Sequence, residues 1–129
     1  MRRLQISLSF IIPLFCYCTF AQNSMRIVTQ VVDGYPALSP DGTKIVFTSN
    51  RSGTYQIYTC NTEGEEIRQL THSCGSNATP VWSPQGDKIV FASERDNDSE
   101  IYIMNADGTE QTRLTSQPGD HSHSKFSPE

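Results

Sequence analysis

The feature that most constrains the fold of this chain is an internal repeat with a period of 44 residues. The turn sequence Ser-Pro-Asp-Gly at residues 39–42 returns as Ser-Pro-Gln-Gly at 83–86, and Ser-Pro-Glu at 127–129 begins it a third time. The residues that follow the turn repeat as well, because Lys-Ile-Val-Phe occurs at 44–47 and again at 88–91. A gapless repeat of this length indicates stacked copies of one supersecondary unit.

Each copy of the repeat carries strand signals and no helix signal. Runs of β-branched and aromatic residues bounded by Gly, Ser and Pro predict strands. They lie at 36–39, 45–47, 56–60 and 67–71 in the first copy, and at 80–83, 89–91, 100–104 and 111–115 in the second. In the turn, Pro presets φ at the second position and Gly adopts a left-handed conformation at the fourth. Four antiparallel strands per 44 residues are typical of a β-propeller blade, so we expect an all-β fold.

The repeat also resembles that of a known family. Leu-Ser-Pro-Asp-Gly-Thr-Lys-Ile-Val-Phe-Thr-Ser-Asn-Arg at 38–51, Gln-Ile-Tyr at 56–58 and Arg-Gln-Leu-Thr at 68–71 are similar to the WD-like repeat of the TolB-like β-propeller family. The resemblance covers residues 25–129 and implies four-stranded antiparallel blades arranged in a ring. The family's namesake has six blades behind an α/β domain and acts in the periplasmic Tol–Pal envelope system. The stretch ahead of the first copy is too short for that α/β domain, so the resemblance extends only to the propeller.

The N-terminus has the pattern of a secretory signal peptide. Arg2 and Arg3 precede an apolar run from Leu8 to Cys18, and small residues stand at the −3 and −1 positions of a cut after Ala21. The run is shorter than the roughly 20 residues that span a bilayer, so we expect cleavage and no transmembrane segment afterwards. The product is then periplasmic or secreted.

The repeat and the leader together predict the domain organisation. We expect a signal peptide at 1–21, an N-terminal segment at 22–35, one blade at 36–79, a second blade at 80–123, and a truncated start of a further blade at 124–129. Residues 26–30 resemble the outer strand at 68–71 and are expected to complete the last blade of a closed ring. Propellers have about four to eight blades, so about two blades form an incomplete ring.

An incomplete ring predicts exposed apolar blade faces. We interpret the chain as a fragment or truncated reading frame, with self-assembly of short chains into a ring as the alternative. The open faces, expected to carry Val46, Ile57, Val90 and Ile101, are the kind of apolar patch that soluble monomers avoid. We therefore expect marginal stability or self-association of the isolated chain.

The charge balance argues against a nucleic-acid partner. After removal of the leader, 14 acidic side chains stand against 8 basic ones (10 less Arg2 and Arg3), a net charge of −6 without any Lys/Arg cluster. Neutralisation of phosphates needs a basic surface, which this chain lacks. The resemblance to the TolB-like family implies instead a protein partner of the envelope or periplasm.

The propeller fold places candidate binding residues on one face. The loops between the second and third strands and the loops between blades share that face, and loops on a rigid scaffold commonly carry function. We expect an interaction face formed by Arg51, His72, Arg95, Asp96 and Asp98. Because Arg51 and Arg95 repeat, we also expect them to have a structural role, such as pairing with carboxylates between blades.

A metal site is the second hypothesis for this face. Asp120, His121 and His123 combine a carboxylate with two imidazoles, a donor set that suits a divalent cation. The alternative is a solvated polar loop, because the equivalent positions of the preceding copy hold no histidine. Apart from this divalent metal, we expect no cofactor.

Two cysteines remain after the expected cleavage, Cys60 and Cys74. The fourth strand of the blade separates them by about 17 Å. A disulfide requires Cα atoms within about 7 Å. We therefore predict that they do not bond to each other and that both are free thiols.

The sequence leaves two classes of function open. The favoured one is an exported, non-catalytic propeller for protein–protein interaction, as the resemblance implies. The alternative is the propeller part of an exported enzyme, either a prolyl-oligopeptidase-type peptidase or a metal-dependent oligosaccharide lyase. No Gly-x-Ser-x-Gly nucleophile motif or glycine-rich phosphate loop occurs in the sequence, which favours binding.

Overall fold

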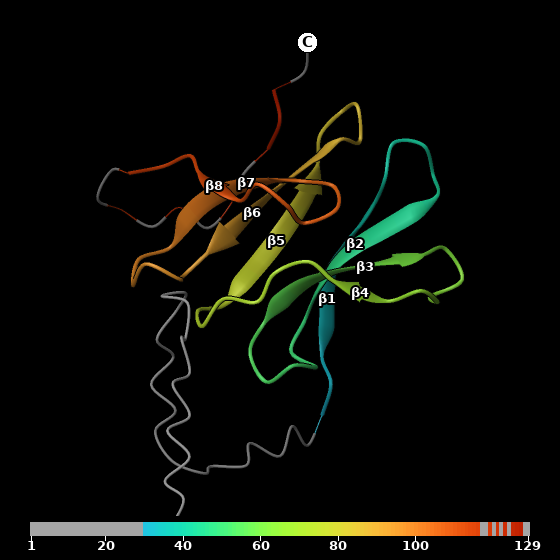
Figure 1. Cartoon of the computed structure of the whole chain (residues 1–129), viewed down its shortest axis with the longest axis horizontal. Helices are drawn as coiled ribbons and strands as arrows, with labels where there is room; N and C mark the ends of the chain where they lie inside the picture. The colour runs from blue at the N-terminus through green and yellow to red at the C-terminus, as the bar shows by residue number, and fades with distance from the viewer. Residues whose placement is uncertain (1–29, 117–118, 120, 122, 124, 128–129) are drawn as a thin grey trace, which may run out of the picture.

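The computed structural model describes residues 30–116, 119, 121, 123 and 125–127, and every regular element in this part is a strand. Two four-stranded antiparallel sheets result (Figure 1). The first sheet contains β1 (Asp33–Leu38), β2 (Lys44–Ser49), β3 (Gln56–Asn61) and β4 (Arg68–Gln69), and the second contains β5 (Asn77–Trp82), β6 (Lys88–Ser93), β7 (Glu100–Asn105) and β8 (Thr112–Arg113), each in that order. The predicted all-β fold with two blade-like sheets is confirmed.

Some predicted segments lie outside the described residues, and others have different bounds in the structure. The signal peptide at 1–21 lies outside the described residues, as does all of the expected closing strand except Gln30. β1 and β5 begin at Asp33 and Asn77, three residues before the repeat boundaries that the sequence suggested. The division into units at 36–79 and 80–123 stays a prediction. Within the described part, no helix is long and apolar enough to cross a membrane.

The Ser-Pro-x-Gly turns join the first two strands of each sheet. The amide of Gly42 donates to the carbonyl of Ser39 at 2.9 Å, and Gly86 donates to Ser83 at 2.9 Å. Both glycines have φ of +73°, a conformation that costs other residues a steric penalty. The repeated turn sequence therefore specifies the repeated hairpin.

Alternation along the strands gives each sheet two apolar faces. Phe47 on β2 lies opposite Tyr58 on β3, and their rings stack at 5.8 Å between centroids. Phe91 and Tyr102 repeat this pair at 5.9 Å in the second sheet. Neighbouring residues such as Val46 point to the other face, because successive side chains of a strand alternate.

The two sheets pack against each other through opposite faces. β5 is the strand of the second sheet that lies against β1, β2 and β3 (Figure 1). The shared core contains Val46, Ile57 and Leu70 from the first sheet, and Trp82, Ile89, Phe91, Tyr102 and Met104 from the second. The indole Nε1 of Trp82 donates to the carbonyl of Ala37 at 3.0 Å, which ties β5 to β1. The expected side-by-side stacking of the copies is therefore present.

Each sheet keeps a smaller cluster on its other face. Phe47, Tyr58 and Cys60 form one on the first sheet, with Ile45 beside them. Val90, Ala92 and Ile101 form one on the second sheet, with Ile103 and Phe126 packed against it. Val90 and Ile101 therefore lie on an outer face, as predicted, but the prediction is wrong for Val46 and Ile57, which are buried in the core between the sheets. The outer face of the first sheet carries Phe47 and Tyr58 instead, because alternation along β2 and β3 turns Val46 and Ile57 toward the second sheet.

The cysteines follow the prediction in part. Cys60 is free and buried, and burial raises the pKa of its thiol. A bond between Cys60 and Cys74 is therefore absent, as expected. Cys74 is disulfide-bonded, so the prediction of two free thiols is wrong at that residue. The sequence argument tested only the pairing of these two cysteines with each other.

Candidate functional site

Three loops meet at one end of the two sheets. They are residues 50–55 between β2 and β3, residues 70–76 between β4 and β5, and residues 94–99 between β6 and β7. The amide of Asn77 donates to the carbonyl of Tyr55 at 2.8 Å, and Glu94 donates to Ser76 at 2.9 Å. A Cβ placed on Gly75 would lie 2.6 Å from the backbone of Glu94 and Arg95. The loops are thus locked to one another by backbone contacts.

Arg51 is anchored within its own sheet. Its guanidinium lies 5.2 Å from the ring centre of Phe47 and 5.1 Å from that of Tyr58, within the range of cation–π contacts. The side chain also pairs with Asp33 at 2.8 Å and donates to Ser49 at 2.9 Å. Arg51 therefore pairs with a carboxylate of its own sheet, and not with one of the neighbouring sheet as the sequence suggested.

Arg95 repeats this arrangement in the second sheet. Its guanidinium lies 5.5 Å from the ring centre of Phe91 and 4.2 Å from that of Tyr102. It donates to the side-chain oxygens of Asn77 at 3.2 Å and Gln111 at 2.9 Å. The recurrence of the stack shows why Arg occurs at both positions of the repeat.

A buried amide is the centre of the polar contacts in the first sheet. The Oε1 atom of Gln56 accepts from Thr71 at 2.8 Å and from Asn77 at 2.8 Å. Its Nε2 atom donates to the carbonyls of Ser73 at 2.9 Å and Gly75 at 3.2 Å. Gln56, Thr71 and Asn77 are all at most 2% exposed, and each has hydrogen-bond partners, as buried polar groups require.

The second sheet replaces this neutral centre with charge. Glu100 stands where the first copy has Gln56 and is only 2% exposed. Its carboxylate accepts from Thr115 and forms an ion pair with Arg113, which replaces Gln69. Arg113 also lies 3.6 Å from the carboxylate of Asp96. A buried carboxylate is tolerated only with such compensation.

Tyr102 completes this set, which we call the charged cluster: Asp96, Glu100, Tyr102 and Arg113. The hydroxyl of Tyr102 donates to the carboxylate of Asp96. Burial of the phenol, together with this hydrogen bond and the charge of Asp96, raises the pKa of Tyr102 to about 12. The phenol therefore remains a hydrogen-bond donor at neutral pH. The cluster presents the half-exposed charges of Asp96 and Arg113 on a buried base, an arrangement suited to polar recognition.

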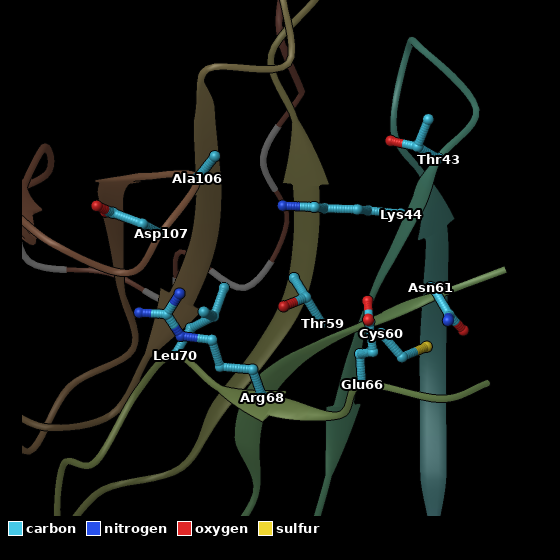
Figure 2. Close-up of a pocket in the computed structure, with 10 residues that line it drawn as sticks. All are labelled: Thr43, Lys44, Thr59, Cys60, Asn61, Glu66, Arg68, Leu70, Ala106 and Asp107. Atoms are coloured by element: carbon cyan, nitrogen blue, oxygen red, sulfur yellow. The ribbon is translucent and has the colours of Figure 1, made fainter. Parts of the chain in front are cut away.

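A second candidate is a groove at the opposite ends of the sheets, where the turns lie. It has a volume of about 540 Å³ and is lined by Thr43, Lys44, Thr59, Cys60, Asn61, Glu66, Arg68, Leu70, Ala106 and Asp107. Figure 2 shows the side chains of Lys44 and Arg68 extending from the first sheet toward the side where Asp107 lies. Hydrogen bonds from Thr109, with the nearby charge of Arg68, hold the pKa of Asp107 below its usual value. The groove carries charges of both signs.

The family whose profile is described as the TolB beta propeller domain matches residues 17–89, which is more than half of the chain. This chain belongs to the TolB β-propeller domain family. Most residues that line the groove lie within the matched range, whereas the charged cluster, at residues 96–113, lies beyond it in the second copy of the repeat.

Two curated relatives of this TolB-type chain have names of different classes, a TolB homolog and a tricorn protease homolog. It is 49% identical over 39 residues to a protein TolB homolog of Chlorobaculum tepidum, a match that covers 30% of this chain and 9% of that protein. It is 42% identical over 38 residues to tricorn protease homolog 1 of Streptomyces coelicolor, covering 30% of this chain and 4% of that protein. The match thus spans less than a tenth of either relative.

Solved structures agree with the family. The putative TolB from Agrobacterium tumefaciens is 32% identical, with a TM-score of 0.61 over 64% of this chain and 33% of that one. TolB from Acinetobacter baumannii is 26% identical, with a TM-score of 0.62 over 69% of this chain and 22% of that one. A puromycin hydrolase at 19% identity and a TM-score of 0.60, over 70% of this chain and 15% of that one, shares the fold.

The remaining predicted site residues of this TolB-type unit are placed separately. His72 and Asp98 are exposed in the loops that follow β4 and β6. His121 donates its amide to the carbonyl of Ser99 at 3.1 Å, and His123 lines a pocket of about 180 Å³ with Tyr35 and other residues. Asp120 lies outside the described residues. Within the described part, no three His, Cys, Asp or Glu side chains gather as a metal site.

Three residues of the charged cluster were not among the predicted site residues: Glu100, Tyr102 and Arg113. A signal for two of them is present in the repeat itself. Between the copies, Gln56 becomes Glu100, Gln69 becomes Arg113 and Ser52 becomes Asp96. Three neutral positions that gain charge together within one TolB-type copy indicate a local ionic network.

Proposed function

We propose that this chain is an exported, non-catalytic propeller module that binds a protein partner in the periplasm or cell envelope. The charged cluster at the loop end of the second sheet is the observation that carries this proposal. Membership of the TolB propeller family supports it, and the signal-peptide pattern at 1–21 supports export. Beside Asp96 of the charged cluster, Arg51, His72, Arg95 and Asp98 supply the remaining polar groups of the proposed face.

The cluster suits binding because its charges are held in place before a partner arrives. Glu100 is buried and orients Arg113, which in turn lies beside Asp96. Tyr102 holds Asp96 from the other side. Side chains that are already ordered lose less conformational entropy on binding than free ones, so more of the interaction energy appears as affinity.

Site-specific photo-crosslinking in cells of the source organism tests this proposal. A benzophenone amino acid at Asp98, on the loop face, should yield a crosslinked protein adduct, whereas the same group at Glu63, on the opposite turn, should not. Asp96→Ala combined with Arg113→Ala should abolish the adduct at position 98. Equal adducts at both positions, or an adduct that survives the double substitution, would contradict the proposal.

A second candidate is the propeller part of an exported peptidase. The match to tricorn protease homolog 1 over 38 residues favours it. Labelling of the full gene product by a fluorophosphonate probe of serine hydrolases would support this candidate against the binding module. A metal-dependent lyase would instead show a bound divalent cation that His121→Ala and His123→Ala remove, as metal analysis would reveal.

A further inference from the structure

The contact between the two sheets is built from a projecting leucine and the surface that receives it. Leu70 follows β4 of the first sheet and is 4% exposed. A Cβ on Gly108 of the second sheet would lie 2.9 Å from the Leu70 carbonyl oxygen and 3.2 Å from its Cβ. Gln111 donates its Nε2 to the same carbonyl at 3.0 Å. Close approach at Leu70 therefore depends on the absence of a side chain at Gly108.

The contact has two halves, the projecting leucine and the surface that receives it. Each half has a counterpart in the other copy of the repeat, and both counterparts are exposed. Leu114 is the counterpart of Leu70 and is 56% exposed. Gly64 and Ile67 are the counterparts of Gly108 and Gln111. Nothing lies within 4 Å of a Cβ on Gly64, and Ile67 is 49% exposed. Leu38, the counterpart of the buried Trp82, is likewise 59% exposed.

The unused receiving surface is a groove on the outer face of the first sheet. It has a volume of about 280 Å³, and its apolar lining is made by Pro36, Ile45, Phe47, Cys60 and Ile67, with Gly64 beside them. The stacked pair of Phe47 and Tyr58 lies beneath this groove. It corresponds to the pair of Phe91 and Tyr102 in the second sheet, which the first sheet covers. The groove thus repeats the surface that already accepts a leucine inside the molecule.

We propose that this outer face binds a second copy of the chain head to tail, with Leu114 of one copy inserted into the groove at Gly64 and Ile67 of the next. The occupant is a second copy because one chain carries the counterparts of both halves, and the contact of Leu70 at Gly108 is the pattern for their packing. Ile67 replaces the hydrogen bond of Gln111 with an apolar contact. The contact is heterologous, since each copy uses a different surface on its two sides.

The C-terminal residues compete with such an incoming copy. The bond from His121 to Ser99 repeats the bond from Asn77 to Tyr55, which begins β5. Phe126, the counterpart of Trp82, packs against the cluster of Val90, Ala92 and Ile101. These residues therefore occupy the position on the second sheet that β1 of another copy would take, and their release would strengthen association.

Analytical ultracentrifugation of the purified chain tests the proposal through variants of the two halves. Leu114→Asp removes the projecting side chain and Ile67→Asp places a charge in the groove. Each should raise the dissociation constant of self-association by at least about tenfold, the effect expected at a buried interface anchor. Tyr55→Ser, an exposed residue of a loop outside both halves, is the matched control and should leave association unchanged.

A mixture of the two variants distinguishes this specific contact from nonspecific association. Leu114→Asp retains the groove and Ile67→Asp retains the leucine, so together they should form a 1:1 dimer with the wild-type dissociation constant and nothing larger. Phe126→Ala should lower the dissociation constant, while circular dichroism and urea unfolding verify that every variant is folded. A wild-type chain that stays monomeric, single variants that associate normally, or a mixture that does not dimerise would overturn the proposal.

Discussion

At the scale of single residues, Gly75 holds the loop end together. Its Cα lies so close to the β6–β7 loop that a Cβ there would overlap backbone atoms of Glu94 and Arg95 at 2.6 Å. Backbone atoms tied into hydrogen bonds cannot move aside as a flexible side chain can. The absence of a side chain at position 75 is therefore a condition for bringing Arg95 and Asp96 next to the first sheet.

Gly75→Ala should lower the free energy of unfolding by about 1–3 kcal/mol, because it forces the two loops apart. Gly34→Ala is the matched control, since no atom lies within 4 Å of a Cβ at that position. Urea unfolding of both variants measures the difference. Equal stability of the two would show that the loops separate without cost.

Tyr102 links stability to pH at the alkaline end. The pKa of its phenol is about 12 in the folded chain and 10.0 ordinarily, so the folded state favours the protonated form. Its contribution to the free energy of unfolding is therefore complete below pH 10 and is lost as the pH rises from 10 to 12. Tyrosinate absorbance should show one late-titrating residue that Tyr102→Phe removes, and a titration unchanged by that substitution would contradict this assignment.

At the scale of elements, the two sheets use one framework with different chemistry. The amide of Ile57 donates to Thr71 at 2.9 Å, and Ile101 donates to Thr115 at 2.9 Å, so the connection to the outer strand is the same in both. Around it, the first sheet has neutral amides and the second has the charged cluster. The charge in the second sheet therefore joins β7 to β8 without changing the strand order.

Arg113→Gln should lower the free energy of unfolding by about 1–3 kcal/mol, because it leaves the buried Glu100 carboxylate without its cation. The double variant Glu100→Gln with Arg113→Gln recreates the amides of the first sheet and should recover most of that loss. Urea unfolding of the single and double variants gives the coupling energy. Additive effects of the two substitutions would rule out a coupled pair.

At the scale of the whole molecule, the two sheets pack together through one interface. The two sheets are copies of one unit, yet each contributes a different one of its two faces to that interface. β5 supplies the central contacts, and Trp82 contributes both an apolar ring and a hydrogen bond to Ala37. Repeat units of this kind stabilise one another through neighbouring copies more than through their own cores. Loss of the contact is therefore expected to weaken both sheets together.

Trp82→Phe should lower the free energy of unfolding by about 1–2 kcal/mol, since the ring is retained in part and the hydrogen bond to Ala37 is lost. Because residues of both sheets share the core around Trp82, amide exchange should accelerate in β2 and β3 as well as in β6 and β7. Leu38→Phe, at the exposed counterpart of Trp82, is the control and should leave exchange unchanged. Acceleration confined to the second sheet would indicate independent sheets.

Much of this architecture was accessible from the repeat. The Ser-Pro-x-Gly turns and the alternating runs after them predicted the hairpins, since local backbone preferences and strand periodicity are properties of short segments. The charged cluster could have been found by comparing position 56 with 100 and position 69 with 113. The packing of Arg51 and Arg95 over aromatic pairs could not, because cation–π stacking depends on which side chains the register places together.

The sequence by itself determined the strand order within each sheet, the hairpin turns and the stacking of equal units, because these follow from a 44-residue period and local conformational preference. Only the tertiary structure decided which carboxylate Arg51 pairs with, which polar groups are buried at Glu100 and Gln56, and which leucine is covered. Leu70 and Leu114 occupy the same position of the repeat, yet one is buried and the other exposed. Burial depends on the neighbour across the interface, which the period of the chain does not specify.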